Sequence, residues 1–211
     1  MEVWAIVVAA GSGSRFGGPK QFEVLDGKPM LEWAVLAAAQ AADGVVLVAP
    51  RHEGRTAVDK VVAGGERRSD SVRAGLASVP EAADVIVVHD AARPFARTEL
   101  FEAVIAAVRG GADGAVPAVP IADTVKRVAG SRVVETLDRS ALVAVQTPQA
   151  FAADALRRAH AGQSDATDDA ALVEAAGGKV VVVEGDRGNF KVTTPRDFEY
   201  AAFLLERTHR P

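Results

Sequence analysis

The chain has 211 residues, 49% of them hydrophobic, and a formal net charge of −4. It is therefore long enough to bury a substantial core, and it has no overall charge attraction for nucleic acid. It contains no cysteine, which excludes disulfide bonds and thiolate metal sites. The N-terminal apolar run is too short to cross a bilayer and lacks the pattern of a secretory signal, so we expect a cytoplasmic protein without a membrane or nucleic-acid partner.

A glycine-rich loop follows the first apolar segment. Residues 3–8 are expected to form a strand, and residues 9–21 then contain four glycines together with Arg15 and Lys20. Glycine lets the backbone approach a ligand closely and adopts positive φ without strain, so such a loop can direct its N–H groups at an anion. Because the two cations add positive charge, the loop predicts a polyphosphate site.

The loop matches neither of two common phosphate-binding motifs. A dinucleotide-binding Rossmann loop requires glycine where Phe16 stands. In a Walker A loop, Pro19 displaces the lysine and Gln21 replaces the Ser or Thr that holds magnesium. The alternative interpretation is a flexible turn between two β elements, but the cations within the loop favour anion binding.

Strands and helices alternate along the rest of the chain. Helices are expected at 29–42, at about 69–79 with Ser69, Asp70 or Ser71 as cap, at 98–109, at 152–161, at 168–176 with Thr167 or Asp168 as cap, and from 195 onward; strands are expected at 21–25, 45–49, 84–89, 114–120, 142–146 and 179–184. The two prolines in 114–120 indicate an irregular or edge course at its end, and 51–60 is expected to form a loop. This alternation predicts one α/β domain over 1–211, with a mostly parallel sheet between layers of helices.

Residues 124–136 break the alternation. Segments 124–128 and 132–136 flank a turn at 129–131 and read as a β-hairpin. The hairpin has too few large apolar residues to be buried on both faces, so we expect an arm at about 121–140 that projects from the sheet and needs a partner.

Polar motifs lie at the predicted strand ends, where an open α/β sheet binds its ligands. In order, they are Ala-Ala-Gly-x-Gly-x-Arg, Pro-Lys-Gln, Gly-Gly-x-x-Arg-x-x-Ser-Val, His-Asp-Ala-Ala-Arg-Pro, Asp-Thr-Val-Lys, Asp-Arg, Thr-Pro-Gln, Thr-Asp-Asp and Asn-Phe-Lys-Val-Thr. Together they resemble the 2-C-methyl-D-erythritol 4-phosphate cytidylyltransferases over nearly the whole chain. The segment 51–60 is shorter than is usual in that family.

The resemblance implies a Rossmann-like three-layer nucleotidyltransferase fold with a mostly parallel sheet and a projecting β-hairpin arm. It also implies transfer of a cytidylyl group from CTP to 2-C-methyl-D-erythritol 4-phosphate, with release of pyrophosphate, in isoprenoid precursor biosynthesis. Arg15 and Lys20 are implied to stabilise charge at the α-phosphate; no protein nucleophile is needed, because the attacking phosphate is already an anion. The residues implied to bind the nucleotide are Ala9, Ala10, Gly11, Ser12, Gly13, Gly65, Glu66, Arg68 and Ser71. The family often has Asp where this chain has Glu66.

The resemblance also implies an acceptor site and a metal. The residues for the polyol phosphate are Arg93, Thr124, Arg139, Thr147, Thr167 and Lys191. Lys191 and Asp90 are further assigned to catalysis, with Asp90 near Mg²⁺, directly or through water, or else only capping the following turn. Thr124 and Arg139 lie on the arm and are implied to serve the partner's site in a homodimer. Thr147 either binds the acceptor or packs at the sheet end, and His89 is interpreted as a packed strand-end residue.

Three other functions share parts of this pattern. A ribitol-5-phosphate cytidylyltransferase shares most of these motifs, because both acceptors are short polyol phosphates. A catalytically silent nucleotide-binding module would not need Arg15, Lys20, Asp90 and Lys191 together. A nicotinamide oxidoreductase is disfavoured by Phe16 and by the absence of an acidic residue after the strand at 45–49.

Overall fold

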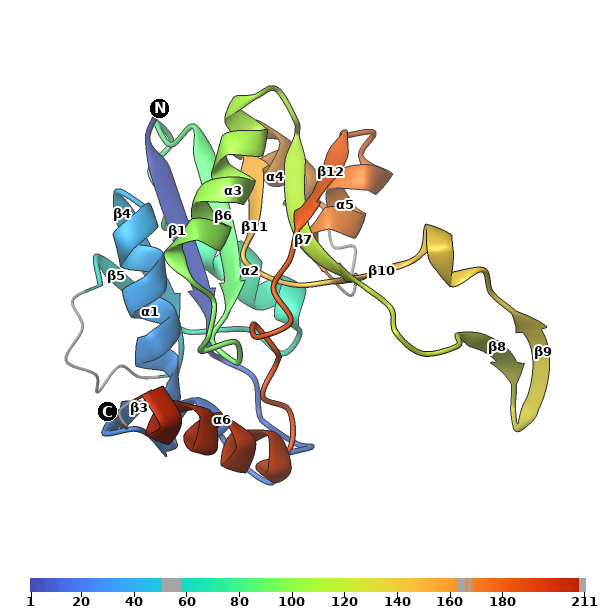
Figure 1. Cartoon of the computed structure of the whole chain (residues 1–211). Coiled ribbons are helices and arrows are strands. Elements are labelled where there is room, and N and C mark those ends of the chain that lie inside the picture. The colour runs from blue at the N-terminus through green and yellow to red at the C-terminus, as the bar shows by residue number, and fades with distance from the viewer. Residues whose placement is uncertain (51–57, 163–165, 167, 209–211) are drawn as a thin grey trace.

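A computed structural model describes residues 1–50, 58–162, 166 and 168–208 of the chain (Figure 1). Its elements are β1 (Val3–Val8), η1 (Lys20–Phe22), β2 (Val24–Leu25), β3 (Lys28–Pro29), α1 (Met30–Ala41), β4 (Gly44–Val48), β5 (Lys60–Val62), α2 (Arg68–Leu76), β6 (Val85–Asp90), α3 (Thr98–Arg109), β7 (Gly114–Pro120), β8 (Lys126–Ala129), β9 (Arg132–Thr136), η2 (Arg139–Ala141), β10 (Val143–Val145), β11 (Gln149–Ala152), α4 (Ala153–His160), α5 (Asp169–Ala175), β12 (Val180–Glu184) and α6 (Pro195–Thr208). Among these helices, none is both long and apolar enough to cross a membrane.

Eight of the strands form one central sheet in the order β10-β7-β11-β6-β1-β4-β5, with β12 paired to β7. The pairs β1–β4, β1–β6, β4–β5 and β7–β12 are parallel, whereas β10 and β11 run antiparallel to their neighbours. The expected mostly parallel sheet is therefore confirmed. Because β1, β4 and β6 are parallel and in register, the segments that follow them leave the sheet at the same edge.

Helices cover both faces of the sheet, because successive strand residues point to opposite sides. Val7 of β1 belongs to a buried cluster with α1 and α3, whereas the neighbouring Ile6 belongs to a second cluster with α2, α4 and α5. Phe101 and Phe151 are fully buried in these two clusters, and burial of each such side chain stabilises the fold by about 1.5–3 kcal/mol. The three-layer fold follows from these two cores.

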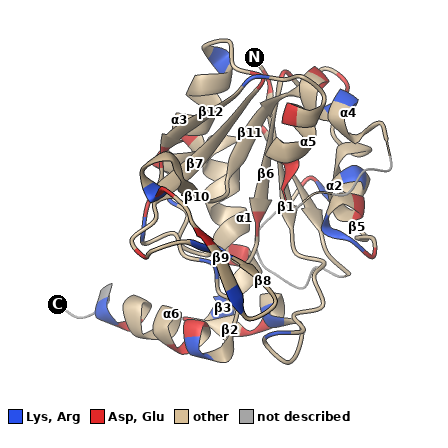
Figure 2. Ribbon diagram, turned by 90° about the vertical axis from the view of Figure 1, so that its right-hand side faces the viewer, with Lys and Arg blue, Asp and Glu red and all other residues tan. Residues whose placement is uncertain are grey.

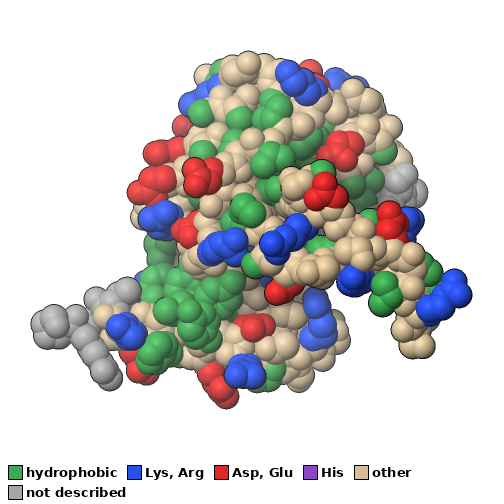
Figure 3. Space-filling view, turned by 45° about the vertical axis from the view of Figure 1, so that its right-hand side comes forward, with side chains coloured by type: hydrophobic (Ala, Val, Ile, Leu, Met, Phe, Trp, Pro, Cys, Tyr) green, Lys and Arg blue, Asp and Glu red, His purple; other side chains and the backbone are tan. Residues whose placement is uncertain are grey.

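Helix α6 packs outside the three layers. Its Ala201 and Leu205 share a small buried cluster with Met30 and Val192, which ties the end of the chain to the start of α1. Figure 3 shows hydrophobic side chains gathered in one patch on the surface in the lower part of the view. The side chain of Phe203, on α6, is 49% exposed.

The expected arm is confirmed as a separate two-stranded sheet of β8 and β9. It extends well away from the body in Figure 1 and points toward the viewer in Figure 2. Every residue of both strands is exposed. An ion pair between Arg127 and Glu135 joins the two strands. Since an isolated hairpin buries almost nothing, the arm has little to hold it in place within one chain.

The two prolines of β7 lie where their missing N–H groups are not needed. Pro120 is paired with Val143 of β10 on one side. Pairing of β7 with β12 ends at Ala118 on the other side, so that side of Pro120 is an open edge, as its sequence position predicts. Pro117 is inside the sheet. Its carbonyl accepts the N–H of Gln146 at 2.7 Å, on the edge where the partner strand changes from β11 to β10.

Some expected elements differ from the structure. The predicted strand at 21–25 is wrong at its start, where η1 occupies Lys20–Phe22, and the predictions omit β3, β5 and β11. Helix α2 is capped by Arg67 rather than by Ser69, Asp70 or Ser71, because the Asp70 carboxylate accepts the Arg67 N–H at 3.1 Å from within the first turn. Asp168 caps α5, as predicted. Most of the loop predicted at 51–60 lies outside the described residues.

Candidate active site

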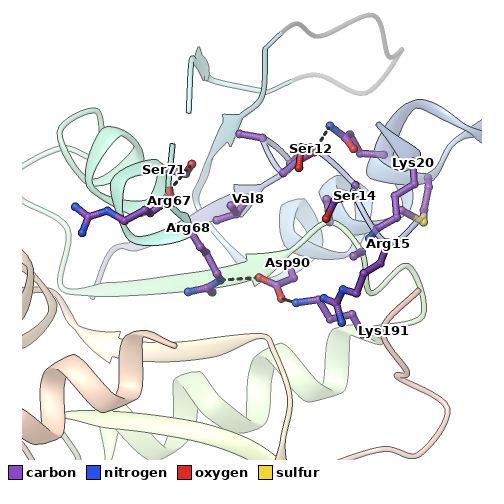
Figure 4. A pocket seen from close by; sticks show the side chains of 18 of the residues that line it. Val8, Ser12, Ser14, Arg15, Lys20, Arg67, Arg68, Ser71, Asp90 and Lys191 are labelled. Atoms are coloured by element: carbon purple, nitrogen blue, oxygen red, sulfur yellow. Dashed lines mark hydrogen bonds and ion pairs between the residues drawn. The ribbon is translucent and has the colours of Figure 1, made fainter. Parts of the chain in front are cut away.

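The site begins where β1 and β6 end side by side. Val8 of β1 is in register with Asp90 of β6, so the glycine-rich loop and a carboxylate emerge next to each other. A cavity of about 450 Å³ lies at this edge, within the size range of small-molecule and cofactor sites. Figure 4 shows side chains that line it.

The cavity brings the predicted nucleotide-binding residues together. Those that line it are Ala9, Ala10, Gly11, Ser12, Gly13, Gly65, Glu66, Arg68 and Ser71, joined by the predicted catalytic residues Arg15, Lys20, Asp90 and Lys191. They come from segments far apart in the sequence: the loop after β1, the start of α2, the end of β6 and the segment before α6. Their roles toward a ligand stay predictions.

The loop after β1 closes on itself around Gly13. The N–H groups of Phe16, Gly17 and Gly18 donate to the Gly13 carbonyl at 2.8, 3.0 and 3.3 Å. Gly13 has φ of +67°, and a Cβ there would lie 1.8 Å from the Gly18 carbonyl oxygen. Glycine is therefore required at this position by both conformation and space.

A second glycine turn packs against the loop. A Cβ at Gly64 would lie 2.2 Å from the Cβ of Ala10, so only glycine allows the two backbones to come so close. The Gly65 N–H donates to Ser71 Oγ at 3.2 Å, which holds the turn on the first part of α2. The two turns thus form neighbouring walls of one cavity.

Three cations lie on one side of the cavity. Arg15, Lys20 and Lys191 are close together in Figure 4. Burial lowers the pKa of Lys20, and the charges of Lys191 and Arg15 lower it further. Within the described residues, Arg15 and Lys20 form no ion pair with a carboxylate. An anion bound here would therefore relieve repulsion among the cations.

Asp90 lies between two cations that reach it from opposite sides (Figure 4). Arg68 Nε contacts Oδ1 at 3.1 Å, and Lys191 Nζ contacts Oδ2 at 2.6 Å. Burial raises the pKa of Asp90, but the charges of Arg68 and Lys191 outweigh it and hold that pKa well below the ordinary value. Asp90 is ionised at neutral pH, and its charge is already balanced before any ligand binds.

A smaller hollow of about 200 Å³ adjoins the cavity and shares Arg68, Asp90 and Lys191 with it. Arg93 and Thr147, both predicted to bind the acceptor, also line it. The described residues therefore offer two adjacent compartments with a shared wall, a geometry suited to two anionic substrates.

Thr147 packs at the sheet end, and its binding of the acceptor stays a prediction. Its Oγ1 accepts the N–H of Asp90 at 3.1 Å and lies 3.1 Å from His89 Nδ1. The hydroxyl is therefore used within the sheet, although the residue lines the smaller hollow. His89 is fully buried and its ring packs on Phe101. Burial lowers its pKa to about 4, so the interpretation of His89 as a packed residue is confirmed.

Two polar residues that support the smaller hollow are not predicted from the sequence as site residues. Gln146 accepts the Asp186 N–H at 3.1 Å and donates to the Asp186 carbonyl at 2.7 Å. Asn189 is fully buried, donates to the Thr147 carbonyl at 2.9 Å and accepts from Arg93 at 2.7 Å through its own carbonyl. Asn189 belongs to the Asn-Phe-Lys-Val-Thr motif, so the motif contained the signal even though only its lysine received a role.

Two predicted acceptor residues are not brought to this site. Thr124 and Arg139 belong to the arm and line neither compartment. Arg139 instead donates to the Ala122 carbonyl, at the base of the arm. Thr167 lies outside the described residues.

The described side chains of this site do not form a complete set of ligands for a divalent cation. The described residues contain no group of three or more His, Asp or Glu side chains that could hold a metal. Asp90 is the carboxylate between the two compartments. Mg²⁺ commonly uses one or two carboxylates together with substrate phosphates and water, so a single carboxylate beside a phosphate cradle matches that pattern.

The chain is similar to known proteins over nearly its whole length. The family model described as 2-C-methyl-D-erythritol 4-phosphate cytidylyltransferase matches residues 3–207. A protein of that name from Nocardia farcinica is 46% identical, over 98% of this chain and 95% of its own length. One from Streptomyces avermitilis is 45% identical, over 96% of this chain and 91% of its own.

Solved structures are also similar to this chain. The crystal structure of 2-C-methyl-D-erythritol 4-phosphate cytidylyltransferase from Thermus thermophilus is similar with a TM-score of 0.84 and 34% identity, over 98% of this chain and 100% of that one. The crystal structure of 4-diphosphocytidyl-2C-methyl-D-erythritol synthase from Anaerococcus prevotii gives a TM-score of 0.83 and 29% identity, with 98% of this chain and 99% of that chain covered.

Proposed function

The chain belongs to the 2-C-methyl-D-erythritol 4-phosphate cytidylyltransferase family, and from this membership we infer that it transfers the cytidylyl group of CTP to 2-C-methyl-D-erythritol 4-phosphate. A phosphate oxygen of the acceptor bonds to the α-phosphorus of CTP, the bond from that phosphorus to the β-phosphate oxygen breaks, and pyrophosphate leaves. The products are 4-diphosphocytidyl-2-C-methyl-D-erythritol and pyrophosphate, and the reaction belongs to the non-mevalonate route to isoprenoid precursors.

One observation supports the proposed placement of the two substrates. The glycine-loop cavity and the smaller hollow share Arg68, Asp90 and Lys191. We propose that the larger cavity binds CTP and the smaller one binds the acceptor phosphate. The shared wall then lies where the two phosphates must meet.

We propose that Arg15 and Lys20 stabilise the five-coordinate phosphorus of the transition state. Both line the nucleotide cavity, and burial and neighbouring cations make the charge of Lys20 unfavourable before an anion binds. Removal of one preorganised hydrogen-bond donor from an oxyanion hole costs about 2.7–4 kcal/mol of barrier, and we expect an effect of this order for each of these cations. The triphosphate lies on Gly11, Ser12 and Gly13 in this proposal, and the cytosine lies between the two glycine turns.

Lys191 and Arg93 are proposed to hold the acceptor. Lys191 lies at the junction of the compartments, 2.6 Å from Asp90. Burial lowers the pKa of Arg93, because its guanidinium is largely removed from water. A phosphate monoester would supply both cations with charge-assisted hydrogen bonds.

We propose that Mg²⁺ accompanies CTP. Asp90 is the proposed protein ligand, directly or through water, with the remaining ligands from phosphates and water. When bound, the ion neutralises charge on the phosphates and makes pyrophosphate a better leaving group.

We also propose a homodimer in which the arm of each subunit reaches the other's site. The support is the exposed hairpin, whose Val128 and Val133 are 57% and 54% exposed. A hairpin of this kind is marginal alone and gains stability when a partner covers it. In this proposal Thr124 and Arg139 act in the partner's acceptor compartment, which explains why they line neither compartment of their own subunit.

The acceptor is tested by release of pyrophosphate from CTP and Mg²⁺ with 2-C-methyl-D-erythritol 4-phosphate or ribitol 5-phosphate supplied separately. We expect turnover with the methylerythritol substrate and at most a trace with the ribitol substrate. Turnover confined to ribitol 5-phosphate would replace the proposed acceptor. Equal inactivity with both, in folded protein, would contradict the proposed function altogether.

A further inference from the structure

Asp169 is a buried carboxylate that no step of the proposed reaction uses. It is the first residue of α5, is 1% exposed and lines neither compartment. It belongs to the Thr-Asp-Asp motif at 167–169, of which sequence analysis gave a ligand role only to Thr167. A buried charge is costly unless it is paired and hydrogen-bonded. The partners of Asp169 therefore indicate its role.

Asp169 has one charged partner and one imidazole partner. Its Oδ2 lies 2.8 Å from Arg68 Nη1, and its Oδ1 lies 2.9 Å from Nε2 of His160. His160 is itself 5% exposed at the end of α4. The carboxylate therefore links α4 and α5 to the first residue of α2.

Arg68 is held by two carboxylates through two different nitrogens. Nη1 contacts Asp169, and Nε contacts Asp90 at 3.1 Å. Because the guanidinium is rigid and planar, two contacts of this kind fix its orientation as well as its position. The chain of contacts thus runs from His160 through Asp169 and Arg68 to Asp90, and then to Lys191 at 2.6 Å.

A guanidinium beside a triphosphate site has a strong competing partner. Arg68 lines the cavity proposed for CTP, and arginine binds phosphate well through paired hydrogen bonds. If only Asp90 restrained Arg68, the guanidinium would be free to turn toward the phosphates. Asp90 would then lose one of its two cations, and its other oxygen would no longer be directed at Lys191.

We propose that Asp169, oriented by His160, is a positioning residue that keeps Arg68 on Asp90 while CTP is bound. The proposal rests on the proposed function, because it requires Arg68 and Asp90 to act in that reaction. In this proposal, the last residue of the Thr-Asp-Asp motif has a role that requires no contact with substrate. Asp169 itself touches neither substrate.

The first test is Asp169→Asn, which keeps the size of the side chain and removes its charge. We expect kcat to fall about tenfold, on the scale of coupling between residues in one charged network. The KM for CTP should stay the same or fall, because the glycine-rich loop is untouched and the released guanidinium can bind the phosphates. Asp113→Asn is the matched control. That carboxylate accepts the Lys179 N–H at 2.7 Å away from both compartments, and its removal should leave kcat unchanged.

A double-mutant cycle separates positioning from general stability. If Asp169 acts through Arg68, Asp169→Asn should change kcat less than about twofold in an Arg68→Gln background. The same tenfold loss in both backgrounds would overturn the inference while leaving the proposed function intact. Normal kcat in Arg68→Gln alone would also overturn the inference, because the contact of Arg68 with Asp90 would then not be needed for the reaction, and it would leave the proposed function intact.

His160 provides a second route if Asp169→Asn does not fold. His160→Gln retains an amide N–H that can reach Asp169, whereas His160→Ala does not. We expect His160→Gln to keep kcat within about twofold of the unchanged protein and His160→Ala to lower it about tenfold, at a temperature where thermal unfolding shows both folded. Equal kcat values in these two variants would contradict the inference.

Discussion

At the scale of the residue, Lys20 lies in surroundings that oppose its own charge. Burial lowers its pKa first, and Lys191 and Arg15 lower it further. The folded protein therefore disfavours the ammonium form relative to water, and this cost falls as pH rises through the pKa. A bound polyphosphate reverses the effect, so the residue is costly in the free protein and useful in the complex.

Lys20→Ala should abolish most turnover without unfolding the protein. We expect kcat to fall about 10²- to 10³-fold, the effect of removing one preorganised stabiliser of transition-state charge. The midpoint of thermal unfolding should be unchanged or higher, because one of three clustered cations is gone. Kinetics and a thermal melt measure the two quantities on the same sample.

Lys28→Ala is the control for this substitution. Lys28 lies over the Trp33 ring at 4.2 Å and lines neither compartment, so its removal should leave kcat unchanged. Turnover in Lys20→Ala within a few-fold of that in Lys28→Ala would remove Lys20 from the mechanism.

The lowered pKa of Lys20 also predicts an alkaline limit to activity. As pH rises through that pKa, Lys20 loses its charge, so kcat/KM for CTP should fall at a pH below the ordinary lysine value of 10.5. Lys20→Arg should move this alkaline limb to higher pH, because a guanidinium stays charged. An alkaline limb at the same pH in both proteins would assign it to another group.

At the scale of the element, the glycine-rich loop depends on one glycine more than on the others. Gly13→Ala places a Cβ 1.8 Å from the Gly18 carbonyl oxygen at a φ of +67°. The left-handed conformation alone costs about 1–2 kcal/mol for a residue with a side chain. Opening of the loop should therefore raise the KM for CTP at least about tenfold.

Gly18→Ala is the matched control for the loop. A Cβ at Gly18 meets nothing within 4 Å, and its φ is not positive. The KM for CTP should stay close to that of the unchanged protein, as measured by initial rates over a range of CTP concentrations. If both variants bind CTP normally, the closed turn around Gly13 is not the phosphate cradle.

The elements that could be predicted carry a strong periodic pattern. Helix α3 and strand β7 have the predicted bounds, because the apolar stripe of one and the apolar run of the other end at clear breaks. Strand β11 was missed because it has only four residues and passes directly into α4 without a turn. Strand β5 has three residues, one of them charged, and its place in the sheet depends on pairing with β4 rather than on its own sequence.

The site residues also divide into those that could be predicted from the sequence and those that could not. The glycine loop and its cations could be predicted, because their chemistry is local in sequence. The contact of Asp169 with Arg68 could not, because it joins residues 101 positions apart and no local pattern records such a pairing. Asp169 and Arg68 each belong to a motif that resembles the family, but only the folded structure shows that the two side chains are in contact.

At the scale of the whole molecule, the strands of the arm do not pack against the described body of their own chain. Its two strands are exposed along their length, and its Arg139 lies outside both compartments. These features match an arm that completes the site of a second copy. They lead to a test in which two inactive subunits restore each other.

Mixed dimers of Arg139→Ala and Lys20→Ala subunits should recover activity. One site then combines the intact Lys20 of the first subunit with the intact Arg139 of the second, so each heterodimer should have about half the activity of the unchanged dimer. Tagged heterodimers, purified and assayed beside each mutant alone, measure this. Heterodimers no more active than the parents would mean that Arg139 does not act in the neighbouring subunit.

In the proposed reaction, an acceptor phosphate attacks the α-phosphorus of CTP within this site. Its most direct test is turnover of 2-C-methyl-D-erythritol 4-phosphate carrying ¹⁸O in its phosphate group, with the products weighed by mass spectrometry. We expect all of the label in 4-diphosphocytidyl-2-C-methyl-D-erythritol and none in pyrophosphate. Label in pyrophosphate, or no labelled cytidine product from folded protein, would contradict it.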